Sequence, residues 1–156
     1  MTKYTVGFLF NKDFRLVCLI RKNRPAWQFG MLNGIGGHIE FNETPIDCMK
    51  REFNEECDYR HQVDWKEFAF LNSQDFIVFC YCAIGFPSLV FAKEDEPIET
   101  IMVSTISSRT DLIENVPWLV HCAIDFLQDG RPAYISAEYP YPSDPILKSE
   151  IKTVYM

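Results

Sequence analysis

The chain has 156 residues, which suits one globular domain spanning residues 1–156 and leaves no room for a second folded unit of ordinary size. Hydrophobic residues make up 47% and aromatic residues 15%, so we expect a packed core, and an intrinsically disordered chain is excluded. The formal net charge of −7 disfavours a general nucleic-acid binder. If this protein handles phosphates, a metal cation should mediate the contact.

The start of the chain and its cysteines predict a cytoplasmic protein. Residues 1–6 contain no basic segment followed by an apolar one, and no apolar run approaches the roughly 18 residues of a membrane span. The six cysteines show no zinc-like spacing, so we interpret them as reduced thiols of the core. We therefore expect no membrane partner.

The first elements predicted are a hairpin and a glycine-rich bend. Residues 5–10 and 15–20 are β-rich runs that flank a turn at residues 11–13. Residues 30–37 contain four glycines, which indicate a backbone that bends sharply or lets another group approach closely.

A helix is predicted next. Thr44 is a good N-cap, Pro45 suits the first helical position, and Asp47 completes a capping-box pattern. Apolar residues then recur at helical spacing and predict the buried face. They are Ile46, Met49, Phe53 and Cys57.

The second half of the chain alternates strands with one more helix. Residues 68–71, 76–84 and 99–106 are predicted strands, and residues 117–127 are a predicted helix. The tail, residues 134–156, has no strong period and is expected to be an ordered wrap or a loose end. Strands flanking two helices favour an α/β or α+β sandwich.

Three carboxylates gather on one face of the first helix. Glu52, Glu55 and Glu56 lie at i, i+3 and i+4, where they repel one another unless a cation lies among them. Hard cations such as Mg²⁺ or Mn²⁺ take several oxygen ligands of this kind. Arg51 can hold one of these carboxylates in a fixed orientation. Taken alone, such a cluster is also typical of a solvated helix face.

The whole window from Gly37 to Tyr59 resembles the signature of the Nudix hydrolases, Gly-x5-Glu-x7-Arg-Glu-U-x-Glu-Glu-x-Gly-U, where U is aliphatic or aromatic. The chain matches eight of the nine specified positions. The departure is Asp58, which stands where the family has Gly. Because Asp tolerates a left-handed conformation, we expect the turn at the helix end to survive. The resemblance implies an α/β/α sandwich with a mixed β-sheet.

The resemblance also implies a metal site and the reaction. Its members use Mg²⁺, with Mn²⁺ as a substitute, to cleave a diphosphate linked to another moiety. By analogy Arg51 orients Glu52, and Glu43 supports the site. The implied metal ligands are the carboxylates of Glu52, Glu55 and Glu56 and the backbone carbonyl of Gly37.

The catalytic base is left open between two places in the chain. Glu52 is one candidate, and a glutamate from a distant loop is the other. Among the distant residues Glu99 ranks first because it opens a predicted strand after the loop, and Glu96 ranks second.

The substrate implied is a nucleotide. Residues 33–37 resemble a segment of the MutT-like branch, which hydrolyses nucleoside triphosphates, oxidised purine nucleotides included, to a monophosphate and pyrophosphate. Asn33 would read the base, since an amide can accept and donate at once, although Asn33-Gly34 is equally a good turn pair. Gly36, His38 and Glu43 are the other residues expected at the substrate. Aromatic residues that could stack on a base, or belong to the core, are Trp27, Phe29, Phe79 and Trp118.

Two other functions are compatible with the sequence besides a nucleoside triphosphate pyrophosphohydrolase. One is hydrolysis of ADP-ribose or a dinucleoside polyphosphate, and the other is a nucleotide sensor without turnover. The only partner expected is the small-molecule nucleotide, and the protein is expected to be a monomer or a homodimer.

Overall fold

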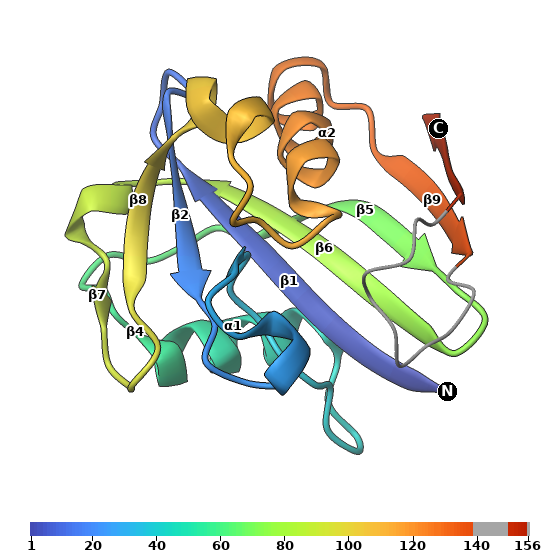
Figure 1. Ribbon diagram of the computed structural model, residues 1–156, viewed down its shortest axis with the longest axis horizontal. Coiled ribbons are helices and arrows are strands. Elements are labelled where there is room, and N and C mark those ends of the chain that lie inside the picture. Colours follow the sequence, from blue (N-terminus) through green and yellow to red (C-terminus); the bar gives the residue numbers. More distant parts are fainter. Residues whose placement is uncertain (139–149, 156) are drawn as a thin grey trace.

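The computed structural model describes residues 1–138 and 150–155, and for residues 137–138 and 150–155 it describes the backbone alone. A β-sheet lies between two helices, α1 on one side and α2 on the other (Figure 1). The strands are β1 (Thr2–Phe10), β2 (Leu16–Arg21), β3 (Leu32–Asn33), β4 (Cys57–Asp58), β5 (Lys66–Asn72), β6 (Phe76–Ile84), β7 (Phe91–Ala92), β8 (Ile98–Met102), β9 (Ala133–Glu138) and β10 (Glu150–Tyr155). The helices are α1 (Pro45–Glu56) and α2 (Val116–Asp129), with 3₁₀ turns η1 (Ala26–Gln28), η2 (Pro87–Leu89) and η3 (Val103–Ser108).

The main sheet is mixed, as the family resemblance implied. Its strand order is β10-β9-β5-β6-β1-β2-β3, and β8 pairs with β2 beside this path. β1 pairs with β6 in parallel along its whole length, and β5 pairs with β9 in parallel. The other neighbours are antiparallel. A separate two-stranded sheet joins β4 to β7.

Successive residues of β1 face opposite sides of the sheet and so build two cores. Phe8 and Phe10 belong to the cluster that α2 covers, whereas Leu9 belongs to the cluster that contains Met49 and Phe53 of α1. This division follows from the alternation of side chains along a strand. The predicted sandwich of two helical layers around a sheet is therefore confirmed.

The first hairpin forms through side-chain bonds of its turn. The Oδ1 atom of Asn11 accepts hydrogen bonds from the backbone N–H groups of Arg15 and Leu16, both at 2.9 Å. Phe14 takes a positive φ of 60° in the same turn. The predicted strands are confirmed, with β1 starting three residues earlier than expected.

α1 begins as its capping residues predict. The Thr44 hydroxyl accepts a hydrogen bond from the backbone N–H of Asp47 at 3.3 Å, and Pro45 occupies the first turn. α2 ends at Gly130, which is left-handed with φ of 71°. Both helices are confirmed, and α2 extends slightly beyond the predicted range at each end.

The prediction of a strand over residues 99–106 is wrong in its second half. β8 ends at Met102, and residues 103–108 form the 3₁₀ turn η3. Thr105 donates its hydroxyl to the carbonyl of Met102 at 2.7 Å, and Ser108 does the same to Thr105 at 3.1 Å. Short hydroxyl side chains thus satisfy backbone carbonyls locally and replace the strand ladder.

The prediction of a left-handed Asp58 is also wrong. α1 passes directly into β4, where Cys57 has φ of −129° and Asp58 pairs with Phe91 of β7. Among the described non-glycine residues only Phe14 and Asn42 have positive φ. Strand pairing keeps this segment extended, so no left-handed turn is needed there.

The tail contributes two strands, β9 and β10, and residues 139–149 lie outside the described part of the chain. The ordered alternative is thus confirmed for the described ends of the tail. All six cysteines are free and buried, as predicted. Within residues 1–138 and 150–155, no helix has the length and apolar character required to cross a membrane.

Candidate active site

The glycine-rich segment lies flat along β1 and is held there by the backbone. Gly7 and Ile35 exchange N–H···O bonds of 2.6 and 3.0 Å, and the Thr5 N–H donates to the Gly37 carbonyl at 2.9 Å. A Cβ atom at Gly36 would lie 2.0 Å from the Thr5 carbonyl oxygen, so only glycine fits. The close approach predicted from the glycines is confirmed.

Gly37 also makes room for the Glu52 carboxylate. A Cβ atom at Gly37 would lie 2.5 Å from Oε1 and 2.7 Å from Oε2 of Glu52. The carbonyl of Gly37 accepts the bond from Thr5 and a long one from the Cys48 thiol at 3.9 Å. Gly37 and Glu52, which resemblance assigned to one site, are therefore in contact.

Arg51 links the glutamates of the motif. Its guanidinium donates to both oxygens of Glu43 at 2.7 and 2.9 Å, and to Glu52 at 2.9 Å and Glu55 at 3.2 Å. It also donates to the carbonyl of His38 at 3.0 Å. The bidentate bond lowers the pKa of Glu43 to about 2. Arg51 thus bonds to three of the four glutamates of the motif.

Glu56 is the most buried of these carboxylates. It is 9% exposed, and its Oε2 atom has no hydrogen-bond partner among the described residues. Burial raises the pKa of Glu56 to about 8, the Lys22 charge opposes this, and the charges of Glu52 and Glu96 add to it. Burial likewise raises the pKa of Glu52. Both groups would be stabilised in their ionised form by a cation.

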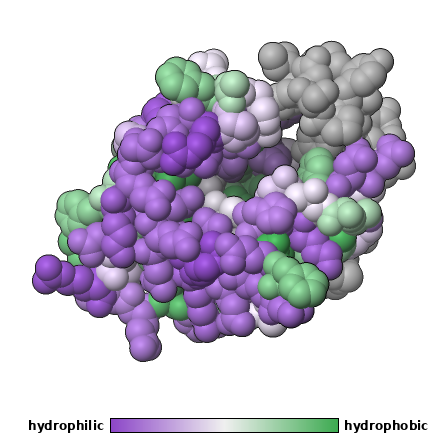
Figure 2. Space-filling model, turned by 90° about the horizontal axis from the view of Figure 1, so that it is seen from below, coloured by the Kyte–Doolittle hydropathy of each residue, from purple (hydrophilic) through white to green (hydrophobic). Residues whose placement is uncertain are grey.

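The residues present fit a divalent cation in chemistry, although they do not yet converge. In the described part of the chain, no three Asp, Glu, His or Cys side chains stand in metal-ligand geometry. The Arg51 guanidinium lies between Glu52 and Glu55 and bonds to each. The buried Oε2 atom of Glu56 nevertheless has no hydrogen-bond partner among the described residues, and a bound cation would supply one interaction for it. The surface seen from below Figure 1, the side on which α1 lies, is largely hydrophilic (Figure 2).

The two distal glutamates differ in their surroundings. Glu99, on β8, forms an ion pair with Arg21, which holds the pKa of its carboxyl below the usual value. Glu96 is 5% exposed, pairs with Lys22 Nζ at 3.0 Å and accepts from the backbone N–H of Asn23 at 2.7 Å. Its charge acts on Glu56. The structure therefore associates Glu96 with the cluster, although Glu99 ranked first.

Asn33 has less free hydrogen-bonding capacity than the sequence suggested. Its Oδ1 accepts from the Gly34 N–H at 2.8 Å, and its Nδ2 donates to Oε1 of Gln28 at 3.4 Å. The side chain of His38 is exposed and meets the ring of Tyr4 edge-on, at 5.5 Å between centroids. The link of His38 to Arg51 runs through its backbone carbonyl.

The sequence did not single out Asn115, which stands at the start of α2. Its Oδ1 is buried without a hydrogen-bond partner and makes no helix-capping bond, and the buried Nε1 of Trp118 is unpartnered too. Backbone bonds of Leu32 with Asp111 and Ile113 place this segment beside β3. In the sequence, Asn115 could have been noticed because it directly precedes Val-Pro at the start of the predicted helix. The same pattern is typical of an ordinary helix cap, so it does not by itself indicate a binding residue.

The aromatic candidates divide into two groups. Trp27 and Phe29 are 48% and 71% exposed and remain available for stacking. Phe79 packs against Phe70 at 5.3 Å between ring centroids, and Trp118 packs against the core that α2 covers. The core interpretation is supported for these two.

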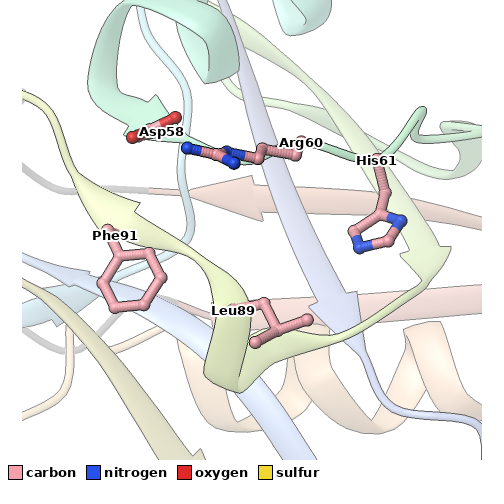
Figure 3. A pocket seen from close by; sticks show the side chains of 5 residues that line it. All are labelled: Asp58, Arg60, His61, Leu89 and Phe91. Atoms are coloured by element: carbon pink, nitrogen blue, oxygen red, sulfur yellow. The ribbon is translucent and has the colours of Figure 1, made fainter.

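A pocket of about 260 Å³ lies beyond the end of α1, between β4 and η2 (Figure 3). Its lining contains none of the glutamates of the motif. Figure 3 shows the Arg60 side chain extending toward Asp58 across the upper rim. The lining residues are Asp58, Arg60, His61, Leu89 and Phe91.

Comparison with known proteins agrees with the fold. The model of the NUDIX domain matches residues 1–106. A mutator MutT protein from Bacillus halodurans superposes with a TM-score of 0.65 and 16% identity, over 97% of each chain. A NUDIX-family hydrolase from Clostridium perfringens superposes with a TM-score of 0.63 and 18% identity, over 81% of this chain and 97% of its own. A MutT NUDIX hydrolase from Burkholderia pseudomallei superposes with a TM-score of 0.62 and 14% identity, over 77% of this chain and 95% of its own. No curated protein matches the chain.

Proposed function

Because this chain belongs to the Nudix hydrolase family, we propose that it is a Mg²⁺-dependent nucleoside triphosphate pyrophosphohydrolase. The reaction takes one nucleoside triphosphate and one water to a nucleoside monophosphate and pyrophosphate. Candidate substrates are purine (deoxy)nucleotides, oxidised ones included. We expect it to act in the cytoplasm, as a monomer or a homodimer.

The buried, unpartnered oxygen of Glu56 carries this proposal. Burial raises the pKa of Glu56 to about 8, which means that its ionised form is unfavourable in the apo protein. A cation bound to the unpartnered oxygen would stabilise the ionised form. The residues that would hold Mg²⁺ are Glu52, Glu55 and Glu56, with the backbone carbonyl of Gly37. Bound there, Mg²⁺ would neutralise phosphate charge, polarise the phosphoryl oxygens and acidify water.

The remaining residues would position water and hold the carboxylates. Arg51 donates to both Glu43 and Glu52 and so orients them, and it lowers the pKa of Glu43. The base is Glu52 or a distal glutamate, and of the distal pair Glu96 is favoured over Glu99. Each is paired with a cation, Glu96 with Lys22 and Glu99 with Arg21, but of the two only Glu96 acts on the charge of Glu56.

The nucleobase would lie at the other end of the glycine-rich segment. Asn33 is expected there with a spare N–H, and the unpartnered Oδ1 of Asn115 would accept from the base. Gly36 and His38 line the path between this end and the glutamates and would contact the phosphates through their backbone.

The test is a panel of nucleotides with Mg²⁺ and separate measurement of pyrophosphate and orthophosphate. We expect pyrophosphate from triphosphates, no turnover in EDTA, recovery with Mg²⁺ or Mn²⁺, and little recovery with Ca²⁺, which coordinates less tightly. If the protein cleaves only ADP-ribose or dinucleoside polyphosphates, nucleoside triphosphates are not its substrates and the proposed substrate class is wrong. Nucleotide binding without any turnover would make the protein a sensor.

A further inference from the structure

Two hydrogen bonds orient the side-chain amides of Gln28 and Asn33. The Gly34 N–H donates to Oδ1 of Asn33 at 2.8 Å, so this oxygen faces the chain itself. Nδ2 of Asn33 consequently faces Gln28 and donates to its Oε1 at 3.4 Å. Since only an oxygen can accept this bond, the Nε2 group of Gln28 is turned away from Asn33.

Each carbonyl oxygen of this amide pair therefore already accepts one hydrogen bond from within the protein. In the described part of the chain, Asn33 is the sole side-chain partner of Gln28. The groups turned away from these two bonds are the Nε2 group of Gln28 and the second N–H of Asn33, and both of them donate. A ligand edge that fits this pair carries adjacent acceptors.

The backbone around Gln28 is rigid. Gln28 donates its N–H to the Pro25 carbonyl at 2.9 Å and accepts from the Met31 N–H at 2.9 Å. Arg21 adds a bond to the Gly30 carbonyl at 2.9 Å. These bonds fix the main chain of Gln28, and the bond from Asn33 orients its side-chain amide before any ligand arrives, which favours selectivity.

The location suits the base of a nucleotide. Trp27 and Phe29 flank Gln28 in the chain and are exposed, so they are available to stack on a flat ring. From Asn33 the chain runs along β1 to Gly37, a span of at most about 14 Å for extended backbone. Gly37 abuts Glu52. One extended nucleotide can therefore reach the amide pair and the glutamates together.

We propose that Gln28 is a specificity-determining residue that selects unoxidised guanine, an inference that rests on the proposed function. Guanine presents two adjacent acceptors, O6 and N7, on one edge, whereas adenine sets the N6 donor beside N7. Oxidation at C8 of guanine places a proton on N7, which would then face an N–H of the amide pair. The donor pair accordingly favours guanine over adenine and over 8-oxoguanine.

Two variants separate the donors from the shape of Gln28. Gln28→Glu replaces the outward N–H group by an acceptor and keeps the bond from Asn33. Gln28→Met removes the polar atoms and keeps the length. Gln74→Met, in the exposed turn between β5 and β6, is the matched control. Binding of dGMP, dAMP and 8-oxo-dGMP to the metal-free protein is measured by calorimetry, beside kcat/KM for the three triphosphates.

We expect the unaltered protein and Gln74→Met to bind dGMP about tenfold or more tightly than the other two nucleotides. Gln28→Met should bring the three within about threefold, and Gln28→Glu should favour 8-oxo-dGMP, whose N7–H finds an acceptor. Equal binding by the unaltered protein, an unchanged order in Gln28→Glu, or no binding at all would overturn the inference. The expected order of binding without hydrolysis would sink only the proposed function, and hydrolysis without base preference would sink only the role of Gln28.

Discussion

Replacing Arg51 by Met should destabilise the protein near neutral pH and much less in acid. Arg51 donates five hydrogen bonds to oxygen, two of them to Glu43. The lowering of the Glu43 pKa from 4.5 to about 2 corresponds to about 3 kcal/mol of stabilisation. The side chains of Arg51 and Glu43 are 24% and 13% exposed, and solvent screening reduces this to about 2 kcal/mol. For a chain of this size that is a fall of about 4–8 °C in Tm.

The dependence on pH follows from the sign of the shift. A carboxyl whose pKa is lowered by folding stabilises the native state above its unfolded pKa, and this contribution is lost as the pH falls through the folded pKa. The difference between Arg51→Met and the unaltered protein should therefore be full above about pH 5 and decline between 4.5 and about 2.

Urea unfolding at pH 7, 4 and 3 measures this difference. Arg15→Met is the control, because the Arg15 side chain is 84% exposed and lies 3.5 Å from its carboxylate partner. It should change the free energy of unfolding by less than about 0.5 kcal/mol. If Arg51→Met equals the unaltered protein at pH 7, or the gap between them persists unchanged at pH 3, the reasoning about the guanidinium and Glu43 is refuted.

Glu52→Gln and Glu56→Gln should each lower kcat about 10²-fold or more. Apo stability should be level or slightly higher, because Gln removes the charge of Glu52 from the cluster and the cost of a buried ionisable group at Glu56. Circular dichroism tests whether the variants fold, and pyrophosphate release measures their turnover. Unfolded variants or normal turnover would contradict this prediction. Glu96→Gln should lower kcat/KM more than Glu99→Gln, whose main effect is a lower Tm from loss of the Arg21 ion pair. The reverse order of kcat/KM would restore Glu99 as the distal base. Asp58→Gly should lower stability by about 0.5–1 kcal/mol, since glycine weakens an extended strand, and leave turnover unchanged. A large loss of turnover in a folded Asp58 variant would place Asp58 in the reaction.

Local chemistry made α1 predictable from the sequence. Its cap is a bond from Asp47 to Thr44, and its glutamates follow the helical repeat, so neither depends on distant residues. The end of the helix was not predictable in this way. Asp58 is extended because β7 pairs with it, and residues more than thirty positions away supply that partner.

The candidate site shows the same division. The sequence by itself determined that four glutamates and an arginine stand at the spacing of a phosphate-cleaving motif and that a glycine-rich segment precedes them, since these are properties of short segments. Only the tertiary structure decided that Glu99 pairs with Arg21, that Glu96 acts on Glu56, and that Asn33 donates to Gln28. The reason is that the pairing of β2 with β8 and the path of the chain before β3 set these neighbours, and strand register is a property of the assembled sheet.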